Sequence, residues 1–288
     1  MTNLDWTSLS HEELEREYSP SSCVVGGIGP LIEQYTTRSR AARDACAAAG
    51  LPVIEMRYGP APTHTLDLVA PRSTGSLVPL IVFIHGGYWQ ELSKLESFFG
   101  APDCLARGVA YAAVDYTLAP HATVGQIVEE CRSALLAIFE AAPEYGVDQN
   151  RIFIAGSSAG AHLAAMATIR RSSSWRPAGL ALLSGIYDLE PLVPTYINEA
   201  LGFDSEMAKT LSPIRQELAG LPPTLIAYGE NETIQFKRQS DTFADALASA
   251  GTPVTNIEVP GRNHFNIVFD LCDPQTPLGE ALLSLVTT

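Results

Sequence analysis

The sequence predicts an α/β protein built on a mainly parallel, twisted β-sheet with helices on both faces. Three observations lead to this class. Strand-like runs alternate with helical stretches along the chain. The run at 80–84, LIVFI, is apolar throughout, as expected for a parallel strand that is buried on both faces. Hydrophobic residues make up 46% of the 288 residues and charged residues 17%, which provides enough apolar material for a large core.

The expected strands and helices follow from these patterns. Strands are expected at 53–57, 65–70, 80–84, 109–116, from Ile152, and at 180–185, 224–229 and 254–259. Helices are expected after a capping box formed by Ser10 and Glu13, then at 31–49, 123–142, after Ser158 and at 235–250.

We expect a single domain over residues 1–288, since the sequence contains no repeat, linker or low-complexity tract. The N-terminal helices, at about 10–50, precede the first strand. The stretch at about 185–222 is Pro-rich and lacks strand character. We expect both segments near the mouth of a site, the second as a small lid insertion.

Composition excludes several classes of function. The formal net charge of −14, from 18 basic and 32 acidic residues, disfavours nucleic acid and anionic membranes as partners. The N-terminus does not resemble a signal peptide, and no apolar run approaches the ~18 residues of a membrane span. The cysteines are too widely spaced for a zinc cluster or a disulfide framework. They are Cys23, Cys46, Cys104, Cys131 and Cys272. These features predict a cytoplasmic protein that holds no metal.

The most informative motif is Gly156-Ser157-Ser158-Ala159-Gly160, which follows an apolar run and precedes an Ala-rich one. This G-x-S-x-G pattern predicts a strand, a sharp turn and a helix, with the Ser158 hydroxyl exposed on the turn. The free N–H groups at the start of the helix would then face an oxyanion that forms at the serine. The pattern also occurs by chance, so the rest of the chain has to support it.

Other polar residues follow the expected strands at the same edge of the sheet. His85-Gly86-Gly87 comes after one strand, Glu230 and Glu232 after another, and His264 after the last. Ligands of parallel α/β sheets bind beyond these carboxyl ends. The chain order serine, acid, histidine is the order of α/β-hydrolases. We therefore expect Ser158 as nucleophile and His264 as base, with Glu232 or Glu230 as the supporting carboxylate.

An oxyanion hole is expected from the N–H groups of Gly86, Gly87 and Ala159, because glycines let the backbone approach a carbonyl oxygen closely. Two further histidines have structural interpretations. His85 is expected to brace the glycine loop, and His162, one turn into the helix after Ser158, is expected to pack.

These residues resemble a known family. The run at 85–89, HGGYW, resembles the loop of kynurenine formamidases (arylformamidases), a branch of the α/β-hydrolases near the hormone-sensitive-lipase-like esterases. The segments EREYSPS at 15–21, SGIYDLEP at 184–191, FKRQS at 236–240 and NHF at 263–265 are similar to other stretches of that branch. The likeness extends over nearly the whole chain.

The resemblance assigns the roles residue by residue. Ser158 matches the nucleophile and His264 the base. The family has an Asp two residues after a Gly-Glu pair, and here Glu232 takes that place, with Glu230 as the alternative. Ser157 stands where a His is common. The implied reaction is hydrolysis of an N-formyl group on an aromatic amine, as in N-formylkynurenine, without a cofactor. By likeness to the family, the chain would form a homodimer.

The substrate is expected to be a small aromatic amide or ester. Tyr88 and Trp89 on the glycine loop are candidates to contact its aromatic part, although packing of the loop is an equal alternative. Ser157, and Tyr187 and Asn198 in the 185–222 stretch, are further candidates, and Arg262 is a possible partner for a substrate carboxylate.

Two alternative functions remain open. The first is an esterase or amidase that acts on other aryl esters, amides or carbamates, since the same catalytic residues serve all of these. The second is a non-catalytic binding protein with a hydrolase fold. Such a protein would be expected to lack a member of the catalytic triad, whereas all three are present here.

Overall fold

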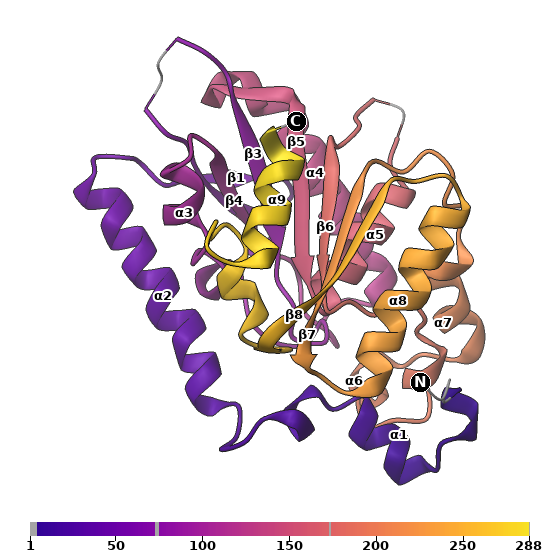
Figure 1. The fold of residues 1–288 in the computed structure, drawn as a ribbon. Helices are drawn as coiled ribbons and strands as arrows, with labels where there is room; N and C mark the ends of the chain where they lie inside the picture. Colours follow the sequence, from indigo (N-terminus) through magenta and orange to yellow (C-terminus); the bar gives the residue numbers. More distant parts are fainter. Residues whose placement is uncertain (1–4, 73–74, 173, 288) are drawn as a thin grey trace.

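Figure 1 shows the chain in a computed structural model that describes residues 5–72, 75–172 and 174–287. The described residues form one eight-stranded sheet with the order β1-β2-β4-β3-β5-β6-β7-β8. Its strands are β1 (Ile54–Arg57), β2 (Thr65–Val69), β3 (Val78–Ile84), β4 (Ala110–Val114), β5 (Val147–Ser157), β6 (Gly179–Leu183), β7 (Thr224–Asn231) and β8 (Val254–Asn263). The pairings from β4 to β8 are all parallel, and only β2 runs antiparallel to its neighbours β1 and β4. The predicted α/β class is confirmed.

The central strands bury side chains on both faces because both faces of the sheet are covered by helices (Figure 1). In β3, Leu80, Val82 and Ile84 join one apolar core, while Ile81 and Phe83 join the other. The first core is covered by α4 (Val124–Ala141), α5 (Ala159–Ile169) and α8 (Ile234–Ser249). The second is covered by α2 (Gly29–Ala48), α3 (Ala101–Leu105) and α9 (Pro277–Thr287).

The remaining helices are short. They are α1 (His11–Glu17), α6 (Asn198–Leu201) and α7 (Ser205–Leu211). The predicted capping box at the start of α1 is present. The Ser10 hydroxyl accepts a hydrogen bond from the Glu13 N–H (3.3 Å), and the Glu13 carboxylate accepts one from the Ser10 N–H (2.8 Å). Among the described residues, no helix is long and apolar enough to cross a membrane.

The structure extends several predicted elements and adds others. Helices α3 and α9 were not predicted, although Leu278, Leu282 and Val286 recur every four residues on the buried face of α9. The largest extension concerns β7 and β8, which were expected to end at 229 and 259. β7 continues to Asn231, and β8 continues past Pro260 to Asn263, where these two asparagines pair. This extension brings the residues that follow the two strands to the same place.

Candidate active site

Ser158 occupies a strained turn between β5 and α5. Its φ of 57° and ψ of −121° lie in a region that non-glycine residues rarely adopt. The turn is fixed by its backbone contacts. The Ser158 N–H donates to the Leu183 carbonyl at the end of β6 (2.8 Å), and the Ser158 carbonyl accepts from Ala161 (3.0 Å). Such a conformation costs about 1–3 kcal/mol and persists only where the surroundings hold it.

The two glycines of the motif are required by close backbone packing. A Cβ atom on Gly156 would lie 2.3 Å from the Gly160 carbonyl oxygen. A Cβ atom on Gly160 would lie 2.0 Å from the carbonyl oxygen of Ile84, the last residue of β3. The start of the helix after Ser158 therefore packs against the carboxyl end of β3. Its first N–H group, that of Ala159, has no carbonyl one turn earlier in the helix to which it could donate.

The loop after β3 lies directly against this turn. A Cβ atom on Gly86 would lie 2.8 Å from the Ser157 carbonyl oxygen and 3.1 Å from the Ser158 Cβ. Gly87 has a φ of +92°, and a Cβ there would lie 2.4 Å from the carbonyl oxygen of Glu91. Only glycine fits both positions, so the loop backbone itself forms the surface beside Ser158.

Tyr116 and His85 orient the peptide groups of this loop. The Tyr116 hydroxyl donates to the carbonyl oxygens of His85 (3.0 Å) and Gly86 (3.2 Å). Because C=O and N–H point in opposite directions in a trans peptide, the N–H groups of Gly86 and Gly87 point away from Tyr116. The His85 ring stacks on Tyr116, with centroids 4.1 Å apart, and its Nδ1 lies 3.0 Å from the Gly86 carbonyl. These contacts agree with a bracing role for His85.

Glu232 and His264 meet at the extended ends of β7 and β8. Glu232 Oε2 lies 2.9 Å from His264 Nδ1, and both residues are buried. The other oxygen, Oε1, accepts from the Ser184 hydroxyl and from the Gly229 N–H, each at 2.6 Å. With every carboxylate oxygen bonded, Glu232 fixes the imidazole with its proton on Nδ1 and leaves Nε2 as the basic nitrogen.

The two candidate carboxylates lie in different environments. Glu230 is exposed, and its Oε2 accepts from the Gly261 N–H at 2.8 Å, whereas Glu232 reaches the histidine. Residues two apart on a strand share a face, but β7 ends at Asn231, so this alternation does not extend to Glu232 and the two carboxylates separate. The geometry therefore favours Glu232 over Glu230 as the partner of His264.

His162 belongs to the packing of α5. Its Nε2 lies 2.8 Å from the Leu211 carbonyl oxygen, and its ring meets the Trp89 ring edge to face at 5.0 Å. Burial lowers the pKa of His162 to about 4, so the ring is neutral at physiological pH. These contacts agree with the packing role expected from the sequence.

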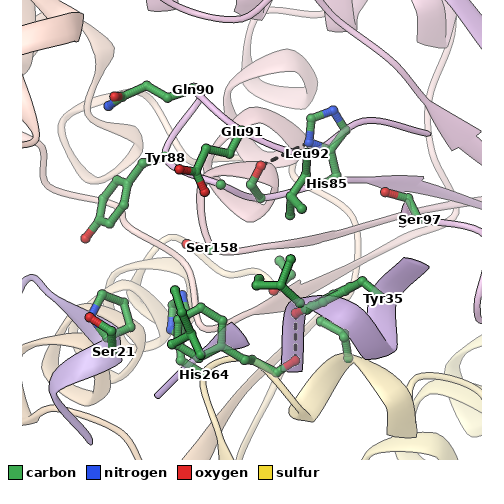
Figure 2. Close-up of a pocket in the computed structure, with 18 of the residues that line it drawn as sticks. Ser21, Tyr35, His85, Tyr88, Gln90, Glu91, Leu92, Ser97, Ser158 and His264 are labelled. Carbon is green, nitrogen blue, oxygen red and sulfur yellow. Dashed lines mark hydrogen bonds between the residues drawn. The ribbon is translucent and has the colours of Figure 1, made fainter. Parts of the chain in front are cut away.

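Ser158 and His264 line the same pocket, a cavity of about 240 Å³ that Figure 2 shows from close by. Its walls combine the strand ends with the two segments expected near the site mouth. The N-terminal part contributes Pro20, Ser21, Ile28, Ile32 and Tyr35, and the 185–222 stretch contributes Tyr196 and Ile197. Ligand pockets usually span about 300–1,000 Å³, so this one suits a small substrate.

The structure divides the predicted substrate-contacting residues into two groups. Tyr88 and Ser157 line the pocket, and the Tyr88 hydroxyl donates to the Tyr18 carbonyl (2.6 Å). The predictions for Tyr187 and Asn198 were wrong, because neither lines this pocket. Trp89 does not line it either, and its full burial agrees with the alternative that it packs the loop.

Each of these three residues has a packing or capping role instead. Trp89 is fully buried between His162 and Phe203, and Tyr187 is fully buried and stacked on Phe243 at 4.2 Å. The Asn198 side chain bonds the backbone of Val193 and Phe203 and closes a local turn. Burial of an aromatic ring depends on tertiary neighbours that a local pattern does not specify.

Arg262 is also corrected as a partner for a substrate carboxylate. Its guanidinium forms a two-pronged ion pair with Asp270, with both N–O distances at 2.7 Å. This planar pairing engages Nε and Nη2 of the guanidinium, and Arg262 does not line the pocket.

Sequence reasoning missed pocket residues that local signals mark. Ile28, Ile32 and Tyr35 recur at helical spacing along α2 and present one face to the pocket. Glu91 and Leu92 directly continue the glycine loop. The helical spacing and the continuation of the glycine loop are the signals in the sequence that mark these five residues.

Comparisons with known proteins agree with this arrangement. A family model described as the alpha/beta hydrolase fold matches residues 81–267. Kynurenine formamidases of Danio rerio and Salmo salar are each 32% identical to this chain, and each match covers 98% of both proteins. Among solved structures, a proposed thioesterase from Silicibacter sp. TM1040 superimposes with a TM-score of 0.83 at 26% identity, covering 96% of this chain and 99% of that one.

Proposed function

The chain is a hydrolase that belongs to the kynurenine formamidase family of α/β-hydrolases, and from this membership we propose that it hydrolyses aryl formamides of the N-formylkynurenine type. One observation carries the proposal. The buried hydrogen bond between Glu232 and His264 lies beside a pocket whose wall also contains Ser158. A serine hydroxyl is a weak nucleophile until a base takes its proton, and this arrangement supplies the base.

In the first half of the reaction, Ser158 Oγ attacks the formyl carbon while His264 Nε2 takes the hydroxyl proton. Glu232 stabilises the imidazolium that results. The carbonyl electrons move to oxygen, and the N–H groups of Gly86, Gly87 and Ala159 donate hydrogen bonds to the oxyanion that results. In related enzymes, one such donor contributes about 3 kcal/mol to the stability of the transition state.

The tetrahedral intermediate then collapses. The C–N bond breaks, and His264 gives its proton to the departing aromatic nitrogen, which leaves as the free amine. Water enters, loses a proton to His264 and attacks the formyl ester on Ser158. The ester bond breaks, the proton returns to Ser158 Oγ and formate leaves. The residues of the chain supply every proton transfer in this cycle.

The shape of the pocket supports a small acyl group. The Gly86 backbone lies against Ser158, where an added Cβ would come within 3.1 Å of the Ser158 Cβ, and a formyl group has no carbon beyond its carbonyl. The pocket wall also includes Tyr88, Ile32 and Phe265, an apolar and aromatic lining that suits an aromatic leaving group. The polar and apolar parts of the pocket thus match the two ends of an aryl formamide.

The test compares N-formylkynurenine, p-nitrophenyl acetate and an aryl carbamate with purified protein, with Ser158→Ala as the control. We expect the highest kcat/KM for the formamide. If formyl anilides show kcat/KM values no better than simple esters, the formamidase proposal fails in favour of a general esterase. If no substrate turns over and an organophosphate does not label Ser158, the chain is a non-catalytic binding protein.

The cellular location and assembly are part of the proposal. All five cysteines are free thiols, and four of them are buried, which supports function in the reducing cytoplasm. The homodimer expected by family likeness stays a prediction. Light scattering on the purified protein tests it.

A further inference from the structure

The pocket wall has an uneven distribution of charge. Among the described residues that line the pocket, Glu91 is the one with a carboxylate, and no lysine or arginine lines it. Figure 2 shows the Glu91 side chain between Tyr88 and Leu92, with its carboxylate turned toward the middle of the pocket. Within the described chain, no basic side chain lies within ion-pair distance of it.

The backbone holds Glu91 in a fixed position relative to the reacting serine. Its N–H donates to the Gly87 carbonyl (3.0 Å), and a Cβ on Gly87 would lie only 3.1 Å from the Glu91 Cβ. Leu92 follows with a φ of 70°, which ends the turn sharply. Glu91 is therefore attached to the same short loop whose Gly86 packs against Ser158.

The described residues that line the pocket offer no lysine or arginine to a substrate carboxylate. Arg262, the cation nearest to the base in the sequence, is paired with Asp270. A carboxylate brought beside Glu91 would meet a like charge, whereas an ammonium group would meet an opposite one. The formal net charge of −14 adds a field of the same sign as Glu91.

We propose that Glu91 makes the enzyme selective for substrates whose leaving group carries an ammonium group, and that a substrate carboxylate does not contribute to recognition. This inference rests on the proposed function, since it places the aromatic amine in the pocket that Glu91 lines. The substrate class is then an aryl formamide with an aliphatic ammonium on its side chain. Glu91 is the residue that determines this specificity.

The test measures kcat/KM for formyl anilides that differ only in side-chain charge. The substrates are N-formylkynuramine, which carries an ammonium, N-formylkynurenine, which carries both charges, the deaminated analogue with the carboxylate alone, and a neutral analogue. We expect the ammonium substrate to be hydrolysed best and the carboxylate substrate worst. An aryl ester series with the same side chains is measured in parallel.

Glu91→Gln keeps the shape of the side chain and removes its charge. Glu91 is exposed, so we expect the ratio of kcat/KM between the ammonium and neutral substrates to fall about three- to fivefold, as for a solvent-exposed ion pair. The loss should reside mainly in KM. In the unchanged protein, the same ratio should fall as salt is added. Glu144→Gln, an exposed carboxylate in the 142–145 turn before β5, is the matched control and should leave the ratio as it was.

The outcomes separate this inference from the proposed function. If formyl anilides are not hydrolysed but aryl esters are, the proposed function fails, and the ester series then decides the role of Glu91. Two results overturn the inference. The first is that the unchanged protein hydrolyses the ammonium and neutral substrates of a series with equal kcat/KM. The second is that Glu91→Gln lowers kcat/KM equally for all substrates.

Discussion

The two sides of the pocket are built in different ways. The catalytic floor consists of residues at the strand ends, and the outer wall comes from the N-terminal segment and the 185–222 stretch. The floor comprises Gly86, Ser158 and His264, and the outer wall comprises Pro20, Ser21, Ile28, Tyr196 and Ile197. The floor is fixed by parallel strand pairings and by backbone packing at the glycines.

The outer wall depends on a few contacts between distant segments. The Ser19 hydroxyl donates to the Tyr196 hydroxyl (3.0 Å), and the Tyr196 N–H donates to a Glu15 carboxylate oxygen (2.8 Å). These bonds join residues that lie more than 170 positions apart in the chain. The comparison indicates that the floor holds the groups expected to react, while the outer wall closes the pocket around the substrate.

The largest effect is expected at the floor. Ser158→Ala removes the nucleophile and should lower kcat for N-formylkynurenine by about 10⁴-fold or more. The substitution leaves the glycine packing of the turn in place, so circular dichroism should show a folded protein. A folded variant that keeps more than a tenth of the activity would contradict the central role of the floor.

A second effect concerns the stability of the helix behind the floor. Burial lowers the pKa of His162 from 6.5 to about 4, mainly by removing the charged ring from water. Above pH 6.5 the ring is neutral in both states and contributes no pH dependence. As the pH falls from 6.5 toward 4, the unfolded chain takes up the proton first, so the free energy of unfolding falls.

The loss from His162 should reach about 3 kcal/mol and level off below pH 4. Urea denaturation from pH 4 to pH 8 measures it, with His162→Gln as the comparison, since Gln retains a donor for the Leu211 carbonyl. The difference between the two proteins isolates this residue from other titrating groups. Equal slopes between pH 4 and pH 6.5 would show that the ring is not buried in its neutral form.

A smaller effect is expected where the glycine loop is oriented. Tyr116→Phe removes the hydroxyl that holds the His85 and Gly86 carbonyls. The loop N–H groups should then be less well oriented toward the oxyanion, so kcat should fall about tenfold while KM changes little. This fall in kcat is smaller than the fall expected when a donor is lost. A change confined to KM would mean that Tyr116 acts on binding rather than on the oxyanion.

The smallest effect is expected at the outer wall. Ser19→Ala removes the hydroxyl that bonds Tyr196 and the Glu15 carbonyl, and it should raise KM about twofold, because an exposed neutral hydrogen bond contributes about 0.5 kcal/mol. Steady-state kinetics on N-formylkynurenine measure the change. A large fall in kcat would contradict the claim that the outer wall does not take part in the reaction.

The same division explains what could be predicted from the sequence. The apolar run at 80–84 and the motif around Ser158 are local patterns, so the parallel sheet and the strained turn were predictable. Glu232 and His264 could be placed at strand ends, but their contact depends on the extension of β7 and β8 past Pro260. Strand ends are the least predictable parts of these elements.

The outer wall and the buried aromatic residues were harder to predict for a physical reason. Trp89 follows a positive-φ residue on an exposed-looking loop, and only its contacts with His162 and Phe203 show that it is buried. Tyr187 lies in a stretch without strand character, and its stacking on Phe243 of α8 is a long-range contact. Tertiary packing, which decides both positions, leaves no periodic signal in the local sequence.

The most direct measurement compares two conservative variants of neighbouring carboxylates. Glu232→Gln should lower kcat by about 10³- to 10⁴-fold, because the imidazole loses the carboxylate that fixes its tautomer and stabilises its charge. Glu230→Gln, on the exposed side of the same strand end, should change kcat by less than about threefold. If Glu230→Gln proves the more damaging variant, or if Glu232→Gln retains nearly full activity while folded, the proposed assembly of Ser158, His264 and Glu232 is wrong.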